Sequence, residues 1–188
     1  STDYVGGIVG YAGKNTFNGA TNTGAVTGTK YVGGIIGQMS GGTLSGAVVN
    51  EGTVTISGTD DCVGGIVGHI INGAAVNGSI NKGEVKNNGT GKYTGGIVGY
   101  SESGAALISG VKNTATVTSK GERVGGIIGK SDASSLSDVE NSGDVIGGRL
   151  TGGIVGYIQN VGDSQNVSIT RATNTGAVTG TKYVGGII

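Results

Sequence analysis

The chain has no proline and no tryptophan, and only one cysteine, one histidine, one phenylalanine and one methionine among its 188 residues. The lone cysteine, Cys62, excludes a disulfide framework and a cysteine-rich zinc site. Twelve basic residues balance twelve acidic ones, and they are scattered. The basic face that a nucleic-acid partner would require is therefore missing. No apolar run approaches the roughly 18 residues of a membrane helix, so membrane insertion is not expected.

Glycine is abundant, with 43 residues, but it follows no three-residue period, which excludes a collagen helix. Low-complexity disorder is also disfavoured, because the apolar residues return at fixed places in a repeat. Aromatic residues make up only 4% of the chain. A flattened, repetitive core needs few large side chains, since small residues stack closely.

One phrase, first seen as V-G-G-I-V-G, occurs seven times with conservative changes. Its glycine pairs begin at positions 6, 33, 64, 95, 125, 152 and 185, in steps of 27 to 33 residues. A period of this size is typical of a solenoid, in which each repeat buries its apolar face against its neighbours. We expect a single β-solenoid over residues 1–188, as an interior fragment of a longer array. Its coils are expected at about 4–30, 31–61, 62–92, 93–122, 123–149 and 150–182, with a partial coil at 183–188.

Each coil contains the glycine phrase, a short alternating segment and a final G-x-V segment that follows an asparagine. Short alternating segments bounded by Gly, Asn, Asp or Ser indicate strands joined by tight turns. No segment has apolar residues at helical spacing. The sequence therefore predicts an all-β fold: a parallel β-helix of about six coils, with three short strands per coil and essentially no helix.

Three columns of apolar residues are expected to fill the interior, one residue per coil in each column. The isoleucine column is Ile8, Ile35, Ile66, Ile97, Ile127 and Ile154, followed by Ile187. The valine column is Val26, Val54, Val85, Val117, Val145 and Val178. The third column is Phe17, Leu44, Val76, Ile108, Leu136 and Ile169.

One asparagine per coil precedes the last strand. These residues are Asn22, Asn50, Asn81, Asn113, Asn141 and Asn174. Asparagine closes turns through its side-chain amide, and stacked amides can bond to the coils on either side. We interpret the row as a structural ladder. The alternative, a row of amides that binds a ligand, is the less favoured one.

The succession G-G-I-V-G-Y, then N-x-G-x-V, then V-G-G-I resembles the GLUG repeat of bacterial surface proteins, with Ile here in place of the usual Leu. The resemblance covers the chain from Tyr4 to Ile188. It implies a secreted, extracellular or cell-surface location, in adhesins or in the non-catalytic parts of large secreted proteases. It supplies no catalytic residue.

Few residues in the chain suggest a catalytic or metal-binding site. His69 shares its slot with Tyr11, Tyr100 and Tyr157, so we interpret it as a variant of a surface position. Neighbouring Asp60 and Asp61 fit a solvated turn better than an acid pair, since adjacent strand residues face opposite ways. We expect no catalytic residue, no cofactor and no metal site, and not an enzyme.

All seven tyrosines flank the glycine phrase. Those proposed as a ligand or partner surface are Tyr11, Tyr31, Tyr93, Tyr100 and Tyr157. Cross-strand stacking that stiffens the sheet is the alternative interpretation.

The leading functional expectation is a structural or adhesive repeat module that acts as a rigid stalk, an adhesin segment or a filament-forming unit. Alternatives are the non-catalytic β-helical part of a secreted protease or polysaccharide-acting enzyme, and a carbohydrate-binding surface that uses the tyrosine slots. Residues 20–36 recur letter for letter at 172–188. The expected partners are therefore further repeats of the same chain, or identical subunits docked end to end, with host or environmental glycans as a third class.

Overall fold

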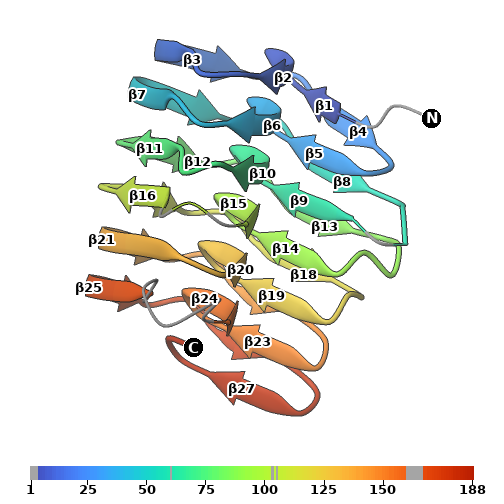
Figure 1. Cartoon of the computed structure of the whole chain (residues 1–188). Coiled ribbons are helices and arrows are strands. Elements are labelled where there is room, and N and C mark those ends of the chain that lie inside the picture. The colour runs from blue at the N-terminus through green and yellow to red at the C-terminus, as the bar shows by residue number, and fades with distance from the viewer. Residues whose placement is uncertain (1–3, 60, 103, 105, 160–166) are drawn as a thin grey trace.

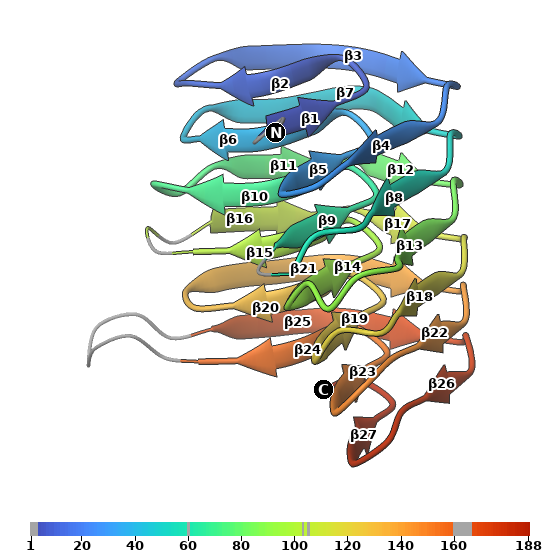
Figure 2. The same cartoon turned by 90° about the vertical axis from the view of Figure 1, so that its right-hand side faces the viewer.

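The computed structural model describes residues 4–59, 61–102, 104, 106–159 and 167–188, and it confirms the fold class. The chain forms an all-β parallel solenoid of about six turns, with no helix among the described residues. All strand pairs are parallel and join each coil to the next, so four sheets run along the length of the rod (Figures 1 and 2).

The strands of the four sheets stack in coil order. The first sheet holds β1 Tyr4–Gly6, β5 Tyr31–Gly33, β9 Cys62–Gly64, β14 Tyr93–Gly95, β19 Arg123–Gly125, β23 Leu150–Gly152 and β27 Tyr183–Gly185. The second sheet holds β2 Val9–Ala12, β6 Ile36–Ser40, β10 Val67–Ile71, β15 Val98–Ser101, β20 Ile128–Ser131 and β24 Val155–Ile158. The third sheet holds β3 Thr16–Asn22, β7 Thr43–Asn50, β11 Ala75–Asn77, β12 Ser79–Asn81, β16 Ala106–Ser109, β17 Lys112–Asn113, β21 Ser134–Asn141 and β25 Ser168–Asn174. The fourth sheet holds β4 Val26–Gly28, β8 Val54–Ile56, β13 Val85–Asn87, β18 Val117–Ser119, β22 Val145–Ile146 and β26 Val178–Thr179.

The expectation of three strands per coil is wrong, because the glycine phrase forms two strands rather than one. The chain turns a corner at Gly-Gly-Ile, so that β9 and β10 belong to different sheets. At this corner the two sheets touch backbone to backbone. A Cβ on Gly64 would lie 2.7 Å from the carbonyl oxygen of Ile97 and 2.8 Å from the amide nitrogen of Gly99. Glycine is therefore required for the approach of the two sheets.

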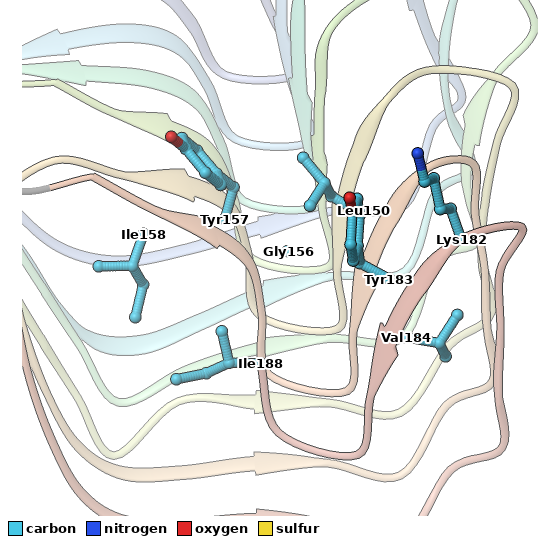
Figure 3. Close-up of a pocket in the computed structure, with 8 residues that line it drawn as sticks. All are labelled: Leu150, Gly156, Tyr157, Ile158, Lys182, Tyr183, Val184 and Ile188. Atoms are coloured by element: carbon cyan, nitrogen blue, oxygen red, sulfur yellow. The ribbon is translucent and has the colours of Figure 1, made fainter.

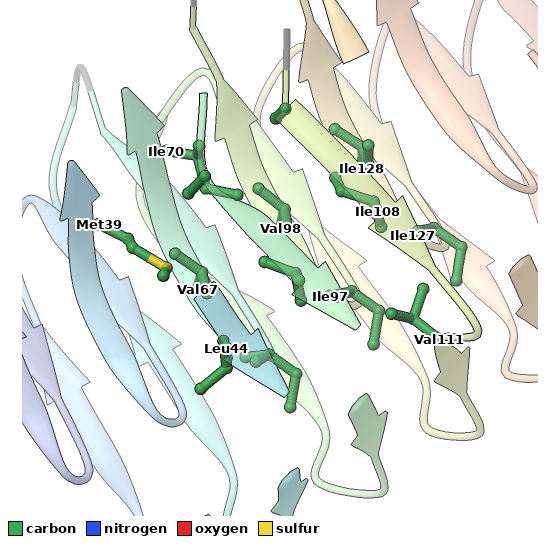
Figure 4. Close-up of a cluster of buried hydrophobic side chains, with 14 of the residues drawn as sticks. Met39, Leu44, Val67, Ile70, Ile97, Val98, Ile108, Val111, Ile127 and Ile128 are labelled. Atoms are coloured by element: carbon green, nitrogen blue, oxygen red, sulfur yellow. The ribbon is translucent and has the colours of Figure 1, made fainter. Parts of the chain in front are cut away.

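The interior is divided into two hydrophobic cores. The larger core lies between the second and third sheets and contains residues such as Met39, Leu44 and Ile97 (Figure 4). The smaller core lies between the first and fourth sheets and is built almost wholly of valine, including Val54 and Val85. Each coil therefore has two lobes, which are joined by a narrow waist.

The registers place like residues on one another along the rod. In the third sheet, Phe17 pairs with Leu44 and Leu136 pairs with Ile169. In the fourth sheet, Val54 is the partner of both Val26 and Val85. The isoleucine column is fully buried from Ile35 through Ile154. Ile8 and Ile187 do not fit the expectation of an interior position: they are 50% and 38% exposed, because the outermost described coils have a neighbour on one side only.

The third sheet bends at one position in every coil, where the backbone takes a positive φ. Glycine occupies this position in four coils, at Gly19, Gly46, Gly78 and Gly110. Asp138 and Arg171 occupy it in the last two coils, with φ of 54° and 51°. The Arg171 guanidinium there binds both carboxylate oxygens of Asp138, at 2.5 and 2.7 Å. The two strained residues are thus joined side chain to side chain.

Candidate functional site

The six asparagines form one continuous ladder through the waist of the rod. Each Nδ2 donates a hydrogen bond to the Oδ1 of the next asparagine, from Asn22 through to Asn174, at 2.8–2.9 Å. Each Nδ2 also donates to the carbonyl two residues further along its own chain, at 2.7–3.0 Å. From Asn50 to Asn141 the side chains are fully buried. Both amide protons of these four residues are used internally, so this part of the row has no donor for a ligand.

The second glycine of each pair lies against this ladder. A Cβ on Gly65 would lie 2.5 Å from Nδ2 of Asn81, and the same contact recurs between Gly96 and Asn113. The glycine corner and the asparagine turn therefore meet across the waist and separate the two cores. The sequence alone does not predict this contact. Its only sign in the sequence is that both motifs recur once in every coil.

Outside the waist, the first and second sheets diverge from the glycine corner, and their outward side chains face each other. We call this face the notch. Its first column is Tyr4, Tyr31, Cys62, Tyr93, Arg123, Leu150 and Tyr183. Its second column is Tyr11, Gln38, His69, Tyr100, Lys130 and Tyr157.

The rings in the notch stack on one another. The centroids of Tyr4 and Tyr31 are 5.5 Å apart with near-parallel planes. His69 lies between Tyr31 and Tyr100, with centroid distances of 4.8 and 5.1 Å. The ring centroids of Tyr93 and Tyr100 are 4.7 Å apart. A sugar ring needs an open aromatic face, and in these coils neighbouring rings and cations cover the faces.

Two cations continue the stack toward the C-terminal end. The Arg123 guanidinium lies over the rings of Tyr93 and Tyr157, at 5.4 and 5.0 Å from their centroids. The Lys130 ammonium lies 4.6 Å from the centroid of Tyr100. Such cation–π contacts are stabilising, and more so where water is excluded.

His69 is not a surface residue as expected from the sequence, because it is only 4% exposed. Its Nδ1 lies 2.8 Å from Nε2 of Gln38, and its Nε2 lies 3.0 Å from a carboxylate oxygen of Glu102. This arrangement fits a neutral ring that accepts from the Gln38 amide and donates to Glu102. Burial lowers the pKa of His69 below its ordinary value, against the opposing effect of Glu102.

Next to His69, a buried ion pair holds the phenol of Tyr100. The Tyr100 hydroxyl donates to Oδ2 of Asp132 at 2.5 Å, and Nζ of Lys130 lies 2.9 Å from Oδ1 of the same carboxylate. Burial, together with the bond to Asp132, raises the pKa of Tyr100 well above its ordinary value. A phenol held this firmly in its protonated form is not an activated nucleophile or base.

One of the two acidic residues considered in the sequence can be placed, and it is not in the solvated position that was expected. Asp60 lies outside the described residues, and Asp61 is buried beside Cys62. Burial, reinforced by Asp61, raises the pKa of the Cys62 thiol. Within the described ranges, no cluster of three or more His, Cys, Asp or Glu could hold a metal ion. The described residues also contain no helix that is long and apolar enough to cross a bilayer.

A cavity of about 560 Å³ opens where the notch reaches the last described coil (Figure 3). Its lining residues come from β23, β24 and β27 and from the residues that flank β27. Tyr157 and Tyr183 both line it, with Ile158, Lys182 and Ile188. It lies in line with the stacked columns of the notch.

No family model matches the chain, and no curated protein or solved structure matches it either.

Proposed function

We propose that the chain is a structural repeat module of the GLUG type, located outside the cell or on its surface, which serves as a rigid stalk, an adhesin segment or a filament-forming unit. The observation that carries this proposal is the continuous asparagine ladder, which passes through every coil by hydrogen bonds of 2.8–2.9 Å. A ladder of this kind couples each coil to the next, as a load-bearing element requires.

The polar side chains of the notch are bonded to one another, which supports a structural role over a catalytic one. Tyr100, Lys130 and Asp132 satisfy one another, and His69 is enclosed by two rings and two polar side chains. A nucleophile must be able to reach a base and a substrate together. No open arrangement of this kind involves these four residues.

Single-molecule pulling between the two ends of the chain tests the proposal. A stalk should resist extension and then release its coils in steps, each on the order of 100 Å for a coil of about 30 residues. A featureless extension at low force would contradict a load-bearing role.

The second candidate is a carbohydrate-binding surface that uses the tyrosines with the greatest exposure. Tyr4, Tyr11 and Tyr183 are 44–53% exposed at the two ends of the notch. Titration of the chain with a panel of glycans tests this candidate. Binding that is lost in Tyr11→Ala and retained in Tyr93→Ala would support it.

A further inference from the structure

The loops that join the fourth sheet to the first follow one another along one edge of the rod, one loop per coil (Figure 1). Five of these six loops carry a lysine or an arginine: Lys30, Lys92, Lys120, Arg149 and Lys182. We call this row the basic edge. In the sequence these cations are far apart, and the fold brings them onto one line. The basic edge thus holds five of the twelve basic residues of a chain whose net charge is zero.

The strand pairings of the first sheet set the spacing of the row. Lys182 and Arg149 immediately precede β27 and β23, which pair with each other, so these two cations lie on adjacent coils. Lys120 lies one coil before Arg149, since β19 pairs with β23. Lys92 lies one coil before Lys120, since β14 pairs with β19. From Lys92 to Lys182 the row therefore presents one cation per coil, in steps of about 4.8 Å along the rod.

Carboxylates in the same loops do not neutralise the basic edge. Two carboxylates belong to the described part of these loops, Asp61 and Glu122. Asp61 is only 6% exposed. Glu122 pairs with a sixth cation, Arg123, with 3.3 Å between its carboxylate oxygen and a guanidinium nitrogen. The exposed charge along this edge is therefore predominantly positive.

Most cations on the other faces of the rod are matched by carboxylates. These ion pairs join Lys82 to Glu51, Lys86 to Glu84, Lys112 to Glu140, Lys130 to Asp132 and Arg171 to Asp138. On the basic edge, no described carboxylate forms an ion pair with Lys30, Lys120, Arg149 or Lys182. The positive charge of these four side chains is therefore available to an external anion.

We propose that the basic edge binds a linear acidic polysaccharide that carries one carboxylate on each sugar, with the polymer lying along the rod. Lysine and arginine form charge-assisted hydrogen bonds with carboxylates. The row is a single loop wide, so it fits one extended polymer chain. Its one cation per coil fits a polymer with one charge per unit, whereas a sulfated glycan with several charges per sugar would exceed the charge of the row.

A nucleic acid fits this edge less well than an acidic polysaccharide. A duplex needs cations spread over a broad face, whereas these cations lie in one row. A single strand needs open aromatic faces on which its bases stack. The tyrosines next to the row are covered by its own cations. The Lys30 ammonium lies 5.2 Å from the ring centroid of Tyr31, and Arg149 and Lys182 lie over Tyr183, at 5.6 and 5.3 Å.

Binding of a fluorescently labelled oligogalacturonate to the whole chain, followed by fluorescence anisotropy at low salt, tests the proposal. Lys120→Gln combined with Arg149→Gln should weaken binding by about tenfold, because two exposed charge pairs are lost. Lys82→Gln combined with Lys112→Gln removes the same charge from the third-sheet side, and it should change the affinity by less than about twofold. The methyl-esterified oligomer has no charge and should not bind, and added salt should weaken binding of the charged one.

A substitution of opposite sign makes the test independent of any loss of folding. Glu122→Gln removes the exposed carboxylate of the basic edge, so it should tighten binding by about threefold. Glu51→Gln removes a carboxylate from the third-sheet side and should leave the affinity unchanged. Tyr11→Ala should also leave it unchanged, which separates the basic edge from the tyrosine surface considered above.

The proposal is overturned if the oligogalacturonate does not bind, if the two double variants weaken binding equally, if Glu122→Gln fails to tighten it, or if single-stranded DNA binds more tightly than the oligogalacturonate. It rests on the adhesive role proposed above. The two fail separately, because the pulling measurement is made on single chains without a glycan. A chain that resists extension but does not bind the oligogalacturonate is a stalk without this site.

Discussion

The side-chain amide of Asn81 lies directly against Gly65 of the same coil, at the waist of the solenoid. A Cβ on Gly65 would come within 2.5 Å of Nδ2 of Asn81. Nδ2 of Asn81 in turn donates to Asn113 at 2.8 Å. The glycine pair and the asparagine are the two most regular features of the sequence, and they contact each other in each coil.

Gly65→Ala should destabilise the protein by about 3 kcal/mol, because the added methyl group meets backbone and a fixed amide rather than a movable side chain. Gly24→Ala is the matched control, since a Cβ there would meet only Oδ1 of Asn22 at an ordinary 3.7 Å. Urea denaturation of both variants measures the difference. Equal losses would mean that the waist is looser than described.

Asn81→Ala should cost about 2–3 kcal/mol, because it leaves the buried amide of Asn50 without its acceptor and Asn113 without its donor. Asn174→Ala should cost less than half as much, since that residue has a ladder partner on one side only. The comparison is again made by urea denaturation. A larger loss at Asn174 would show that the ladder is not the main contribution of these side chains.

Ile97→Asp should be far more damaging than Ile8→Asp, although both residues belong to the isoleucine column. Ile97 is fully buried, and an unpaired charge there costs at least about 4 kcal/mol. Ile8 is 50% exposed, so its carboxylate would remain hydrated. Thermal unfolding of the two variants should differ accordingly, and similar midpoints would contradict the burial pattern.

His69 should make the protein less stable in mild acid. Its pKa is lowered in the folded state, mainly by burial, from an ordinary value of 6.5. The folded state therefore disfavours the proton, so the stability present above pH 6.5 is lost as the pH falls from 6.5 toward the folded pKa.

His69→Tyr, which copies the residue of the next coil, should flatten the change in unfolding free energy between pH 7.5 and pH 5.5. His69→Gln serves as a second non-titrating control. A pH dependence that persists in both variants would assign the effect to other groups.

The sequence was sufficient for the fold class, because the period and the position of each apolar residue repeat in every coil. It was not sufficient for the number of strands. Gly64 and Gly65 interrupt an apparently continuous β segment, and only the contact with the backbone of the neighbouring coil shows that the chain turns there. The division into two cores follows from that turn.

The notch was the least predictable region. His69 and Lys130 occupy slots that tyrosine fills in other coils, and in isolation a mixed column of this kind reads as solvent-exposed. His69 is covered by Tyr31 and Lys130 by Tyr93, which come from other strands, and the Lys130 ammonium also pairs with Asp132, two residues further along the chain. Side-chain contacts between neighbouring coils cannot be predicted from the sequence of a single repeat.

The distance between Thr27 and Thr179 tests the central claim most directly, since it spans the rod along one sheet. Spin labels at these two exposed positions should give a narrow distance distribution by pulsed electron paramagnetic resonance, for dilute monomer, with backbone positions on the order of 24 Å apart. A broad distribution, or a mean distance more than about two coil spacings away from this value, would contradict a continuous parallel solenoid.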